Sequence, residues 1–178
     1  MKLHNYIMDS GISNIYINDV LEKSQLKRFK GVFSCNNIPK HILLYKYFNI
    51  ICNLDKEGEK GSHFVAIVAN PNKILYIDPL GNDCANESLC KFMRRASQPQ
   101  QQERSRPTRK RKIHSLNIAM QHPLSPFCGF YSMLFMLFYD ETEPPIEIKF
   151  SSSNLENNDK KCIDYIIQLL HLHLKKQH

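Results

Sequence analysis

A cysteine at position 128 stands directly ahead of a long apolar run, Phe130 to Tyr139. The run has the length and composition of a buried helix, which places the Cys128 thiol at a helix N-terminus. There the helix macrodipole favours the thiolate over the thiol, and the thiolate is the nucleophilic form of cysteine. Gly129, which has no side chain, would let a substrate backbone approach the sulfur. The pattern indicates a thiol nucleophile.

A glutamine, Gln121, lies seven residues upstream of Cys128, on the far side of a turn stiffened by Pro123 and Pro126. A side-chain amide in that place could donate a hydrogen bond to the oxyanion that forms when a thiolate attacks a carbonyl group. Gln121 is therefore the candidate oxyanion-hole donor.

The base and its partner are found at the ends of two short apolar runs, residues 64–69 and 74–77, which are separated by a tight turn. Both runs are typical of buried strands. If the strands are antiparallel neighbours, His63 at the start of the first lies beside Asp78 at the end of the second. A carboxylate that accepts from one imidazole nitrogen fixes the tautomer and leaves the other nitrogen free to take the thiol proton. The predicted triad is Cys128, His63 and Asp78.

Each of these residues also has an ordinary structural explanation. A cysteine before an apolar helix is more often a core residue, a histidine at a strand start is more often structural, and Asp-Pro at a strand end is most often a turn. The catalytic interpretation depends on finding all of them together, in this order.

These residues need a framework that brings them together, and the remaining patterns predict one. We expect an α+β fold, with helices packed on a mixed central sheet, in a single domain covering residues 1–178. The predicted helices cover residues 19–25, 87–96, 130–140 and 159–176, and the predicted strands cover 31–35, 41–54, 64–69, 74–77 and 113–120.

The net charge of +7 comes from one segment, because residues 94–112 hold eight Lys or Arg and a single acid, Glu103. Residues 97–112, rich in Gln, Pro and Arg, are expected to be disordered or a long surface loop. The segment could be a solvated loop, a nuclear-localisation signal or a nucleic-acid contact. The candidate nucleic-acid contacts are Arg104, Arg106, Arg109, Lys110, Arg111 and Lys112.

Other patterns argue against several classes of protein. No apolar run is long enough to cross a bilayer, and the N-terminus lacks a signal-peptide core, so we expect no membrane partner and synthesis in the cytosol with access to the nucleus. The six cysteines form no Cys-x-x-Cys pair. They are therefore expected to be reduced thiols, with no metal site.

Three motifs resemble those of the adenovirus protease (adenain) family, which has relatives in large DNA viruses and virus-like transposons; more remotely, the chain is similar to SUMO-specific proteases. The motifs are Gly61-Ser-His63-Phe-Val-Ala-Ile-Val-Ala-Asn-Pro71, Tyr76-Ile-Asp78-Pro-Leu-Gly81 and Gln121-His-Pro-Leu-Ser-Pro-Phe-Cys128-Gly-Phe-Tyr131. The likeness spans residues 61–138. Two positions depart from the family pattern: Phe64 replaces a common Trp, and Asp78 replaces a typical Glu, as in SUMO proteases.

The resemblance implies a papain-like cysteine protease fold of the adenain/SUMO-protease type. His63 would be the general base, Asp78 its orienting acid and Cys128 the nucleophile. The Gln121 side chain and the Cys128 N–H would form the oxyanion hole. The implied substrates are viral precursor polypeptides cut during virion maturation, in the host nucleus and the virion. The family also implies stimulation by viral DNA and by a short viral peptide, but no other cofactor.

Two rival functions stay open at this point. One is a ubiquitin- or SUMO-type isopeptidase, which would use the same chemistry on a different substrate. The other is a nucleic-acid-binding virion protein with a decayed protease core, which would bind DNA through residues 94–112 and have no reactive thiol.

Overall fold

A five-stranded sheet forms the centre of the protein. The structure, a computed structural model, describes residues 12–99, 110–140 and 147–175. The strands are β1 (Phe29–Ser34), β2 (Phe48–Asn53), β3 (Phe64–Ala69), β4 (Lys73–Ile77) and β5 (Lys112–Ser115). The helices are α2 (Asn14–Lys23), the 3-10 helix η1 (Lys40–Leu44), α3 (Glu87–Ser97), α4 (Cys128–Phe138) and α5 (Leu155–Lys175).

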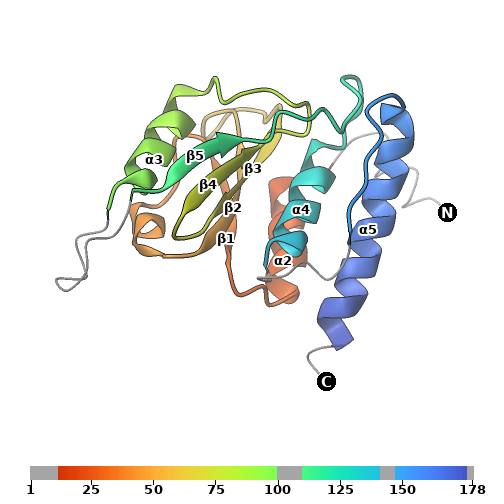
Figure 1. The fold of residues 1–178 in the computed structure, drawn as a ribbon, viewed down its shortest axis with the longest axis horizontal. Coiled ribbons are helices and arrows are strands. Elements are labelled where there is room, and N and C mark those ends of the chain that lie inside the picture. Colours follow the sequence, from red (N-terminus) through yellow and green to blue (C-terminus); the bar gives the residue numbers. More distant parts are fainter. Residues whose placement is uncertain (1–11, 100–109, 141–146, 176–178) are drawn as a thin grey trace.

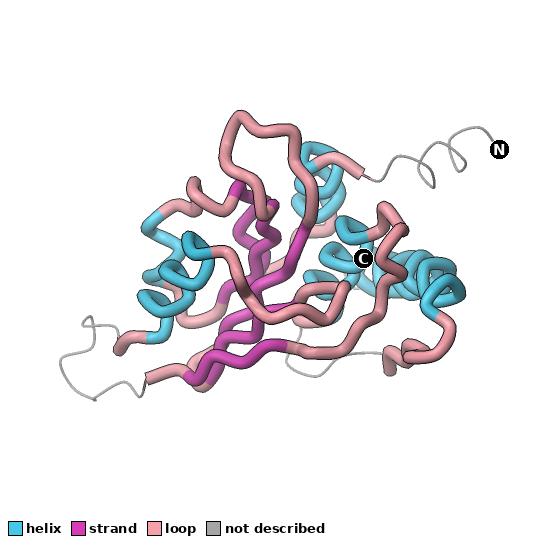
Figure 2. The backbone as a smooth tube through the Cα atoms, turned by 90° about the horizontal axis from the view of Figure 1, so that it is seen from above, coloured by secondary structure: helices cyan, strands magenta, loops and turns pink. Residues whose placement is uncertain are grey.

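The strands lie in sequence order across the sheet, from β1 at one edge to β5 at the other. The central pairs, β2–β3 and β3–β4, are antiparallel, whereas each edge strand runs parallel to its neighbour. The sheet separates two groups of helices: α3 covers one face, and α2, α4 and α5 lie on the other (Figures 1 and 2). The predicted α+β fold with a mixed central sheet is confirmed.

Two hydrophobic cores form because alternate residues of the central strands point to opposite faces of the sheet. On β3, Ala66 and Val68 pack beneath α4, while Val65, Ile67 and Ala69 pack beneath α3. Burial on both faces explains why β3 reads as a continuous apolar run. The strand predicted over residues 64–69 matches β3 residue for residue.

One predicted strand, residues 41–54, is divided between two elements. Its first part belongs to η1, a 3-10 helix that begins after Pro39, and only its second part forms β2. Within η1, Ile42 is buried but Leu44 is 58% exposed. The apolar residues at 41–47 therefore do not belong to a strand, although their composition predicted one.

The strand predicted over residues 113–120 is shorter than expected, since β5 ends at Ser115. Beyond it, the N–H groups of Met120 and Gln121 both donate to the carbonyl oxygen of Pro79, at 2.9 and 3.0 Å. The chain therefore leaves the sheet and attaches to the turn that follows β4. None of the helices in the described part of the chain combines the length and apolar character needed to cross a bilayer.

Candidate active site

His63 lies one residue before β3, and the strand register sets it beside the end of β4. The N–H of Leu54 donates to the carbonyl oxygen of His63 at 2.9 Å, which holds the histidine backbone against the end of β2. Across the other edge of β3, Ala66 pairs with Ile77. Asp78, the next residue along, is thereby brought next to the His63 side chain, as the sequence predicted.

The Asp78 carboxylate is held by three donors. Its Oδ1 lies 2.7 Å from His63 Nε2 and accepts the Leu80 N–H at 2.9 Å. Its Oδ2 accepts from the Asn82 side-chain amide at 3.1 Å. Burial would raise the pKa of Asp78, but the hydrogen bonds from His63 and the Leu80 N–H outweigh it and hold the pKa below its ordinary value. The carboxylate is therefore ionised at neutral pH and can orient the imidazole.

The His63 ring is largely buried, with 15% of its side chain exposed. Burial alone would lower the pKa of His63, but its hydrogen bonds with Asp78 and Cys128, and the negative charge that both groups can carry, raise the pKa to about 9. Nε2 is engaged by Asp78, so Nδ1 is the nitrogen available to Cys128. The ring can hold a proton between the thiol and the carboxylate at neutral pH.

Cys128 is the first residue of α4. The N-cap is Phe127, whose side chain has no atom that can accept from the helix N-terminus. The first N–H that bonds back into the helix is that of Tyr131, which donates to the Phe127 carbonyl oxygen at 3.0 Å. The N–H groups of residues 128–130 precede it and point out of the helix end. They supply the positive end of the macrodipole at the sulfur and a backbone donor for an oxyanion.

Gln121 is buried beside this helix end, with 3% of its surface exposed. Its side-chain amide donates to the carbonyl oxygen of Ser125 at 2.5 Å, which fixes the direction of the NH₂ group. A primary amide carries two N–H bonds, so the second one is left for another acceptor. The Gln121 Oε1 atom finds no hydrogen-bond partner among the described residues.

A groove of about 330 Å³ connects these groups. His63, Gln121 and Cys128 all line it, together with Leu80 and Pro123. The structure thus brings together in one cavity the base, the thiol and the amide that the sequence singled out, with Asp78 directly behind the base.

Gly129 packs against the protein's own side chains, whereas the sequence predicted that a substrate backbone would approach there. A Cβ atom at Gly129 would meet Ile12 Cγ1 at 2.8 Å and Ile17 Cδ1 at 3.1 Å. The space that the glycine leaves open is therefore occupied by the protein's own side chains, and not by a path for substrate. Ile12 itself lines the groove.

Arg111 does not fit its predicted role as a nucleic-acid contact. It is 7% exposed, and its guanidinium group donates to the carbonyl oxygens of Ala96, Tyr45 and Lys46 at 3.0 to 3.1 Å. A buried guanidinium that donates to three backbone carbonyls is not available to a phosphate. Arg111 instead joins the end of α3 to the loop before β2.

The other predicted nucleic-acid residues fall into two groups. Lys110 and Lys112 are exposed and line a shallow hollow beside α3. Arg104, Arg106 and Arg109 lie outside the described residues.

Sequence reasoning missed the residues that hold the candidate catalytic groups in place. Asn82, which donates to Asp78, directly follows the Asp-Pro-Leu-Gly turn. Its position only four residues after the acid in the sequence could have indicated this contact. Ser125, which orients the Gln121 amide, lies within the motif but offers its backbone carbonyl, a group that every residue carries.

The fold is that of the papain-like cysteine proteases of the SUMO-protease and adenain-like type. A crystal structure of the ASFV pS273R protease superposes with a TM-score of 0.58 and 18% identity, over 90% of this chain and 66% of that chain. The SUMO protease Ulp1, with its catalytic cysteine oxidised to a sulfinic acid, superposes with a TM-score of 0.50 and 13% identity, over 89% of this chain and 78% of that chain.

The present chain thus spans about two thirds of the ASFV protease. No protein-family model matches the chain, and no curated protein sequence matches it.

Proposed function

We propose that this protein is a cysteine endopeptidase with a Cys128–His63–Asp78 triad and an oxyanion hole that contains Gln121. The observation that carries the proposal is the hydrogen-bonded pair of His63 and Asp78 at the groove in which the Cys128 thiol lies. The fold supports it, because the SUMO protease Ulp1, which shares the fold, has a catalytic cysteine.

The proposed reaction begins when the Cys128 thiolate attacks the carbonyl carbon of a peptide bond, with the proton held on His63. The negative charge that develops on the carbonyl oxygen is met by the Cys128 N–H and by the free N–H of Gln121. The imidazolium then gives its proton to the departing amine, and the C–N bond breaks. Water, activated by the neutral His63, hydrolyses the thioester and releases the thiol.

We further propose that the substrates are viral precursor polypeptides, cut during virion maturation in the host nucleus and the virion. The support is the likeness of the three motifs to the adenain family, together with the fold that the chain shares with the ASFV protease. A short viral peptide as activator belongs to the same proposal.

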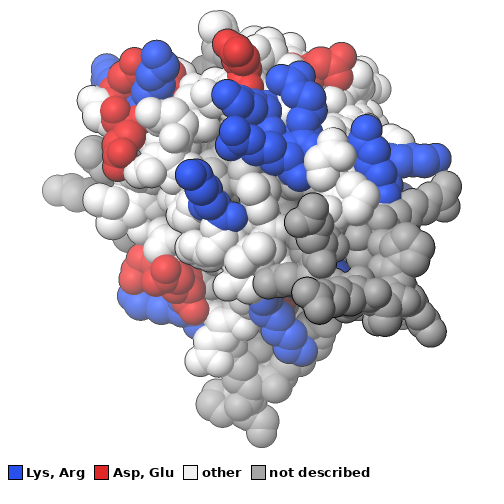
Figure 3. Space-filling model, turned by 90° about the vertical axis from the view of Figure 1, so that its left-hand side faces the viewer, with Lys and Arg blue, Asp and Glu red and all other residues white. Residues whose placement is uncertain are grey.

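Viral DNA is the proposed macromolecular partner. Figure 3 shows Lys and Arg side chains gathered on the end of the molecule that carries α3. Arg94 on α3, Lys110 and Lys112, the first residue of β5, line one hollow. Cations that converge on one surface favour binding to the DNA backbone by counterion release.

An isopeptidase that acts on ubiquitin- or SUMO-like conjugates is the second candidate. Its support is the aspartate at position 78, which the SUMO proteases share, and the structural likeness to Ulp1. A ubiquitin aldehyde or a SUMO vinyl sulfone separates the two candidates: strong labelling of Cys128 by either probe would favour the isopeptidase.

Iodoacetamide tests the proposed active site directly. All six cysteines lie in the described residues, and we expect Cys128 to be alkylated much faster than the other five near neutral pH. His63→Ala should slow that alkylation, whereas His114→Ala, at an exposed histidine on β5, should not. Cys128→Ala should abolish peptide cleavage and leave the unfolding transition in place. Equal, slow alkylation of all six thiols would overturn the proposal.

A further inference from the structure

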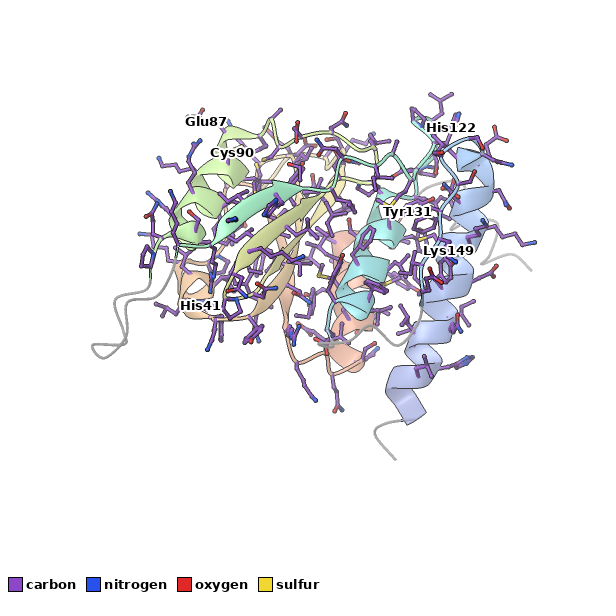
Figure 4. The ribbon with its side chains drawn as sticks, in the orientation of Figure 1. His41, Glu87, Cys90, His122, Tyr131 and Lys149 are labelled. Atoms are coloured by element: carbon purple, nitrogen blue, oxygen red, sulfur yellow. The ribbon has the colours of Figure 1, made fainter. Side chains whose placement is uncertain are left out.

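A second group of thiols lies across the sheet from the proposed active site. Cys84 precedes α3, and Cys90 lies within its first turns, on the face of the sheet opposite α4. Figure 4 labels Cys90 on α3 and Tyr131 on α4, and the sheet runs between them. The two thiols therefore belong to a separate site.

The two sulfurs are in direct contact. Cys90 Sγ lies 3.1 Å from Cys84 Sγ and 3.1 Å from the carbonyl oxygen of Cys84. A disulfide bond is about 2 Å long, so the sulfurs need to approach by only about 1 Å to become bonded. The backbone between them includes the first turn of α3, in which the Cys90 N–H donates to the Asn86 carbonyl oxygen at 2.9 Å.

Solvent access distinguishes this pair from the other cysteines outside the proposed active site. Cys84 and Cys90 are partly exposed, whereas Cys35, Cys52 and Cys162 are buried. Among the described residues, no group of three or more His, Cys, Asp or Glu side chains could hold a metal ion. Two adjacent, accessible thiols without a third ligand favour oxidation over metal binding.

We propose that Cys84 and Cys90 form a reversible disulfide, and that this dithiol is a site of oxidation by peroxides that is independent of Cys128. The Cys90 sulfur attacks hydrogen peroxide: an S–O bond forms, the O–O bond breaks, and water leaves. The Cys84 sulfur then attacks the Cys90 sulfur: the S–S bond forms, the S–O bond breaks, and the departing hydroxide takes the Cys84 proton. Two thiols and one peroxide give one disulfide and two waters.

The order of the two steps follows from the surroundings of Cys84. The Cys84 thiol donates to the Asn86 carbonyl oxygen at 3.6 Å. Burial, followed by its hydrogen bond with Cys90, also raises the pKa of Cys84 to about 12, so this sulfur keeps its proton at neutral pH. Cys90 is therefore the sulfur that meets the oxidant first, and Cys84 resolves the sulfenic acid.

The disulfide would close a short ring around the N-terminus of α3. The ring contains Asn86, which caps α3 and whose side-chain amide donates to the Leu54 carbonyl oxygen at 2.9 Å. It begins two residues after Asn82, which donates to Asp78. Oxidation would thus tie the loop that contains Asn82, and that supports Asp78, to α3. The proposed disulfide does not depend on protease activity.

The 178-residue chain with the Cys128→Ala substitution tests the proposal, because among its cysteines only the pair then remains accessible. After treatment with hydrogen peroxide and quenching by N-ethylmaleimide, we expect intact-mass analysis to show a loss of about two hydrogens, and peptide mapping to join residue 84 to residue 90. Dithiothreitol should restore the starting mass. A sulfenic or sulfinic acid on either cysteine without a cross-link, or a cross-link that involves Cys35 or Cys52, would overturn the proposal.

Two further variants fix the roles of the sulfurs. In Cys128→Ala/Cys84→Ser, dimedone should trap a sulfenic acid on Cys90. In Cys128→Ala/Cys90→Ser, the dimedone adduct should be at least several-fold weaker at residue 84 under the same conditions. A matched control, Cys128→Ala/Cys162→Ser, removes a buried thiol and should form the cross-link as before. Equal trapping at both sulfurs would contradict the proposed order.

Discussion

Asn158, on α5, donates through its side-chain amide to the backbone carbonyl oxygen of Met120, 2.9 Å away. The hydroxyl group of Tyr131, on α4, lies 3.0 Å from the same oxygen. Both side chains are fully buried. Met120 directly precedes Gln121, and the N–H groups of both bond to the Pro79 carbonyl. Two helices and the turn after Asp78 thus fix the backbone that presents the proposed oxyanion donor.

Replacing Asn158 with alanine should therefore lower kcat on a peptide substrate, by about tenfold or more, because a misplaced Gln121 stabilises the oxyanion less well. The KM should change little. Alkylation of Cys128 by iodoacetamide forms no oxyanion, so its rate should stay near that of the wild type. Asn157→Ala, at the exposed neighbour, is the matched control. A parallel fall in alkylation and peptidase activity would show general damage and not misplacement of the amide.

Gln121→Ala removes the proposed donor itself. Loss of one oxyanion donor typically costs about 10²–10³ in kcat, and we expect a fall in that range, again with unchanged alkylation of Cys128. Gln168→Ala, on the exposed side of α5, should have no effect on either rate. A Gln121→Ala variant that keeps full peptidase activity would exclude the side-chain amide from the oxyanion hole.

The pairing of His63 with Asp78 sets how the stability and the peptidase activity of the protein depend on pH. Folding raises the pKa of His63 from 6.5 to about 9. The imidazolium therefore contributes stability that is fully present below pH 6.5 and is lost as the pH rises through 9. Peptidase activity should also fall as the pH rises through 9, because the protonated ring is the proton donor to the leaving amine. This fall is the alkaline limb of the pH profile.

Asp78→Asn should move that alkaline limb to lower pH, since it removes one of the interactions that raise the pKa of His63. The free energy of unfolding, measured with urea between pH 7 and pH 10, should then fall less steeply than in the wild type. The matched control is Asp83→Asn, at an exposed carboxylate nearby. An unchanged pH profile of kcat/KM in Asp78→Asn would mean that the carboxylate does not set the proton affinity of the ring.

Three of the four residues proposed for catalysis could be found from sequence because each lies at the end of an element with a strong local signal. The continuous apolar runs of β3 and β4, and the apolar helix α4, mark His63, Asp78 and Cys128 by position. The parallel pairing of both edge strands has no such signal, since it joins segments that are far apart in the sequence. The contact of Asn158 with Met120 likewise spans 38 residues.

Amphipathic periodicity was also an incomplete guide to α5. Ile166 and Ile167 are adjacent apolar residues of the predicted helix, yet Ile166 is 4% exposed and Ile167 is 49% exposed. The buried face instead includes Cys162 and Leu169, because the helix packs on α4 through one narrow stripe. Adjacent apolar residues on a helix point about 100° apart, so a single stripe cannot bury both.

Arg111 should matter for stability. Arg111→Ala leaves three carbonyl oxygens without their donor, and we expect the free energy of unfolding to fall by about 2 kcal/mol or more. Lys110→Ala, one residue away and exposed, should change it by less than about 0.5 kcal/mol. In contrast, Lys110→Ala/Lys112→Ala should weaken DNA binding and flatten its salt dependence. Equal effects of Arg111→Ala and Lys110→Ala on urea unfolding would contradict the structural role.

A double-mutant cycle tests the packing role of Gly129 against the role in substrate approach that the sequence suggested. If its bare Cα serves packing, Gly129→Ala should destabilise the protein by about 1–3 kcal/mol, because the new methyl group would meet Ile12 at 2.8 Å. The cost should shrink when Ile12 is also replaced by alanine, which removes the closest of these contacts and leaves that with Ile17 at 3.1 Å. If the glycine serves substrate approach instead, the cost in stability will be small in both backgrounds, and Gly129→Ala will raise KM whether or not Ile12 is present. Urea unfolding of the four proteins, together with peptide kinetics, distinguishes these outcomes.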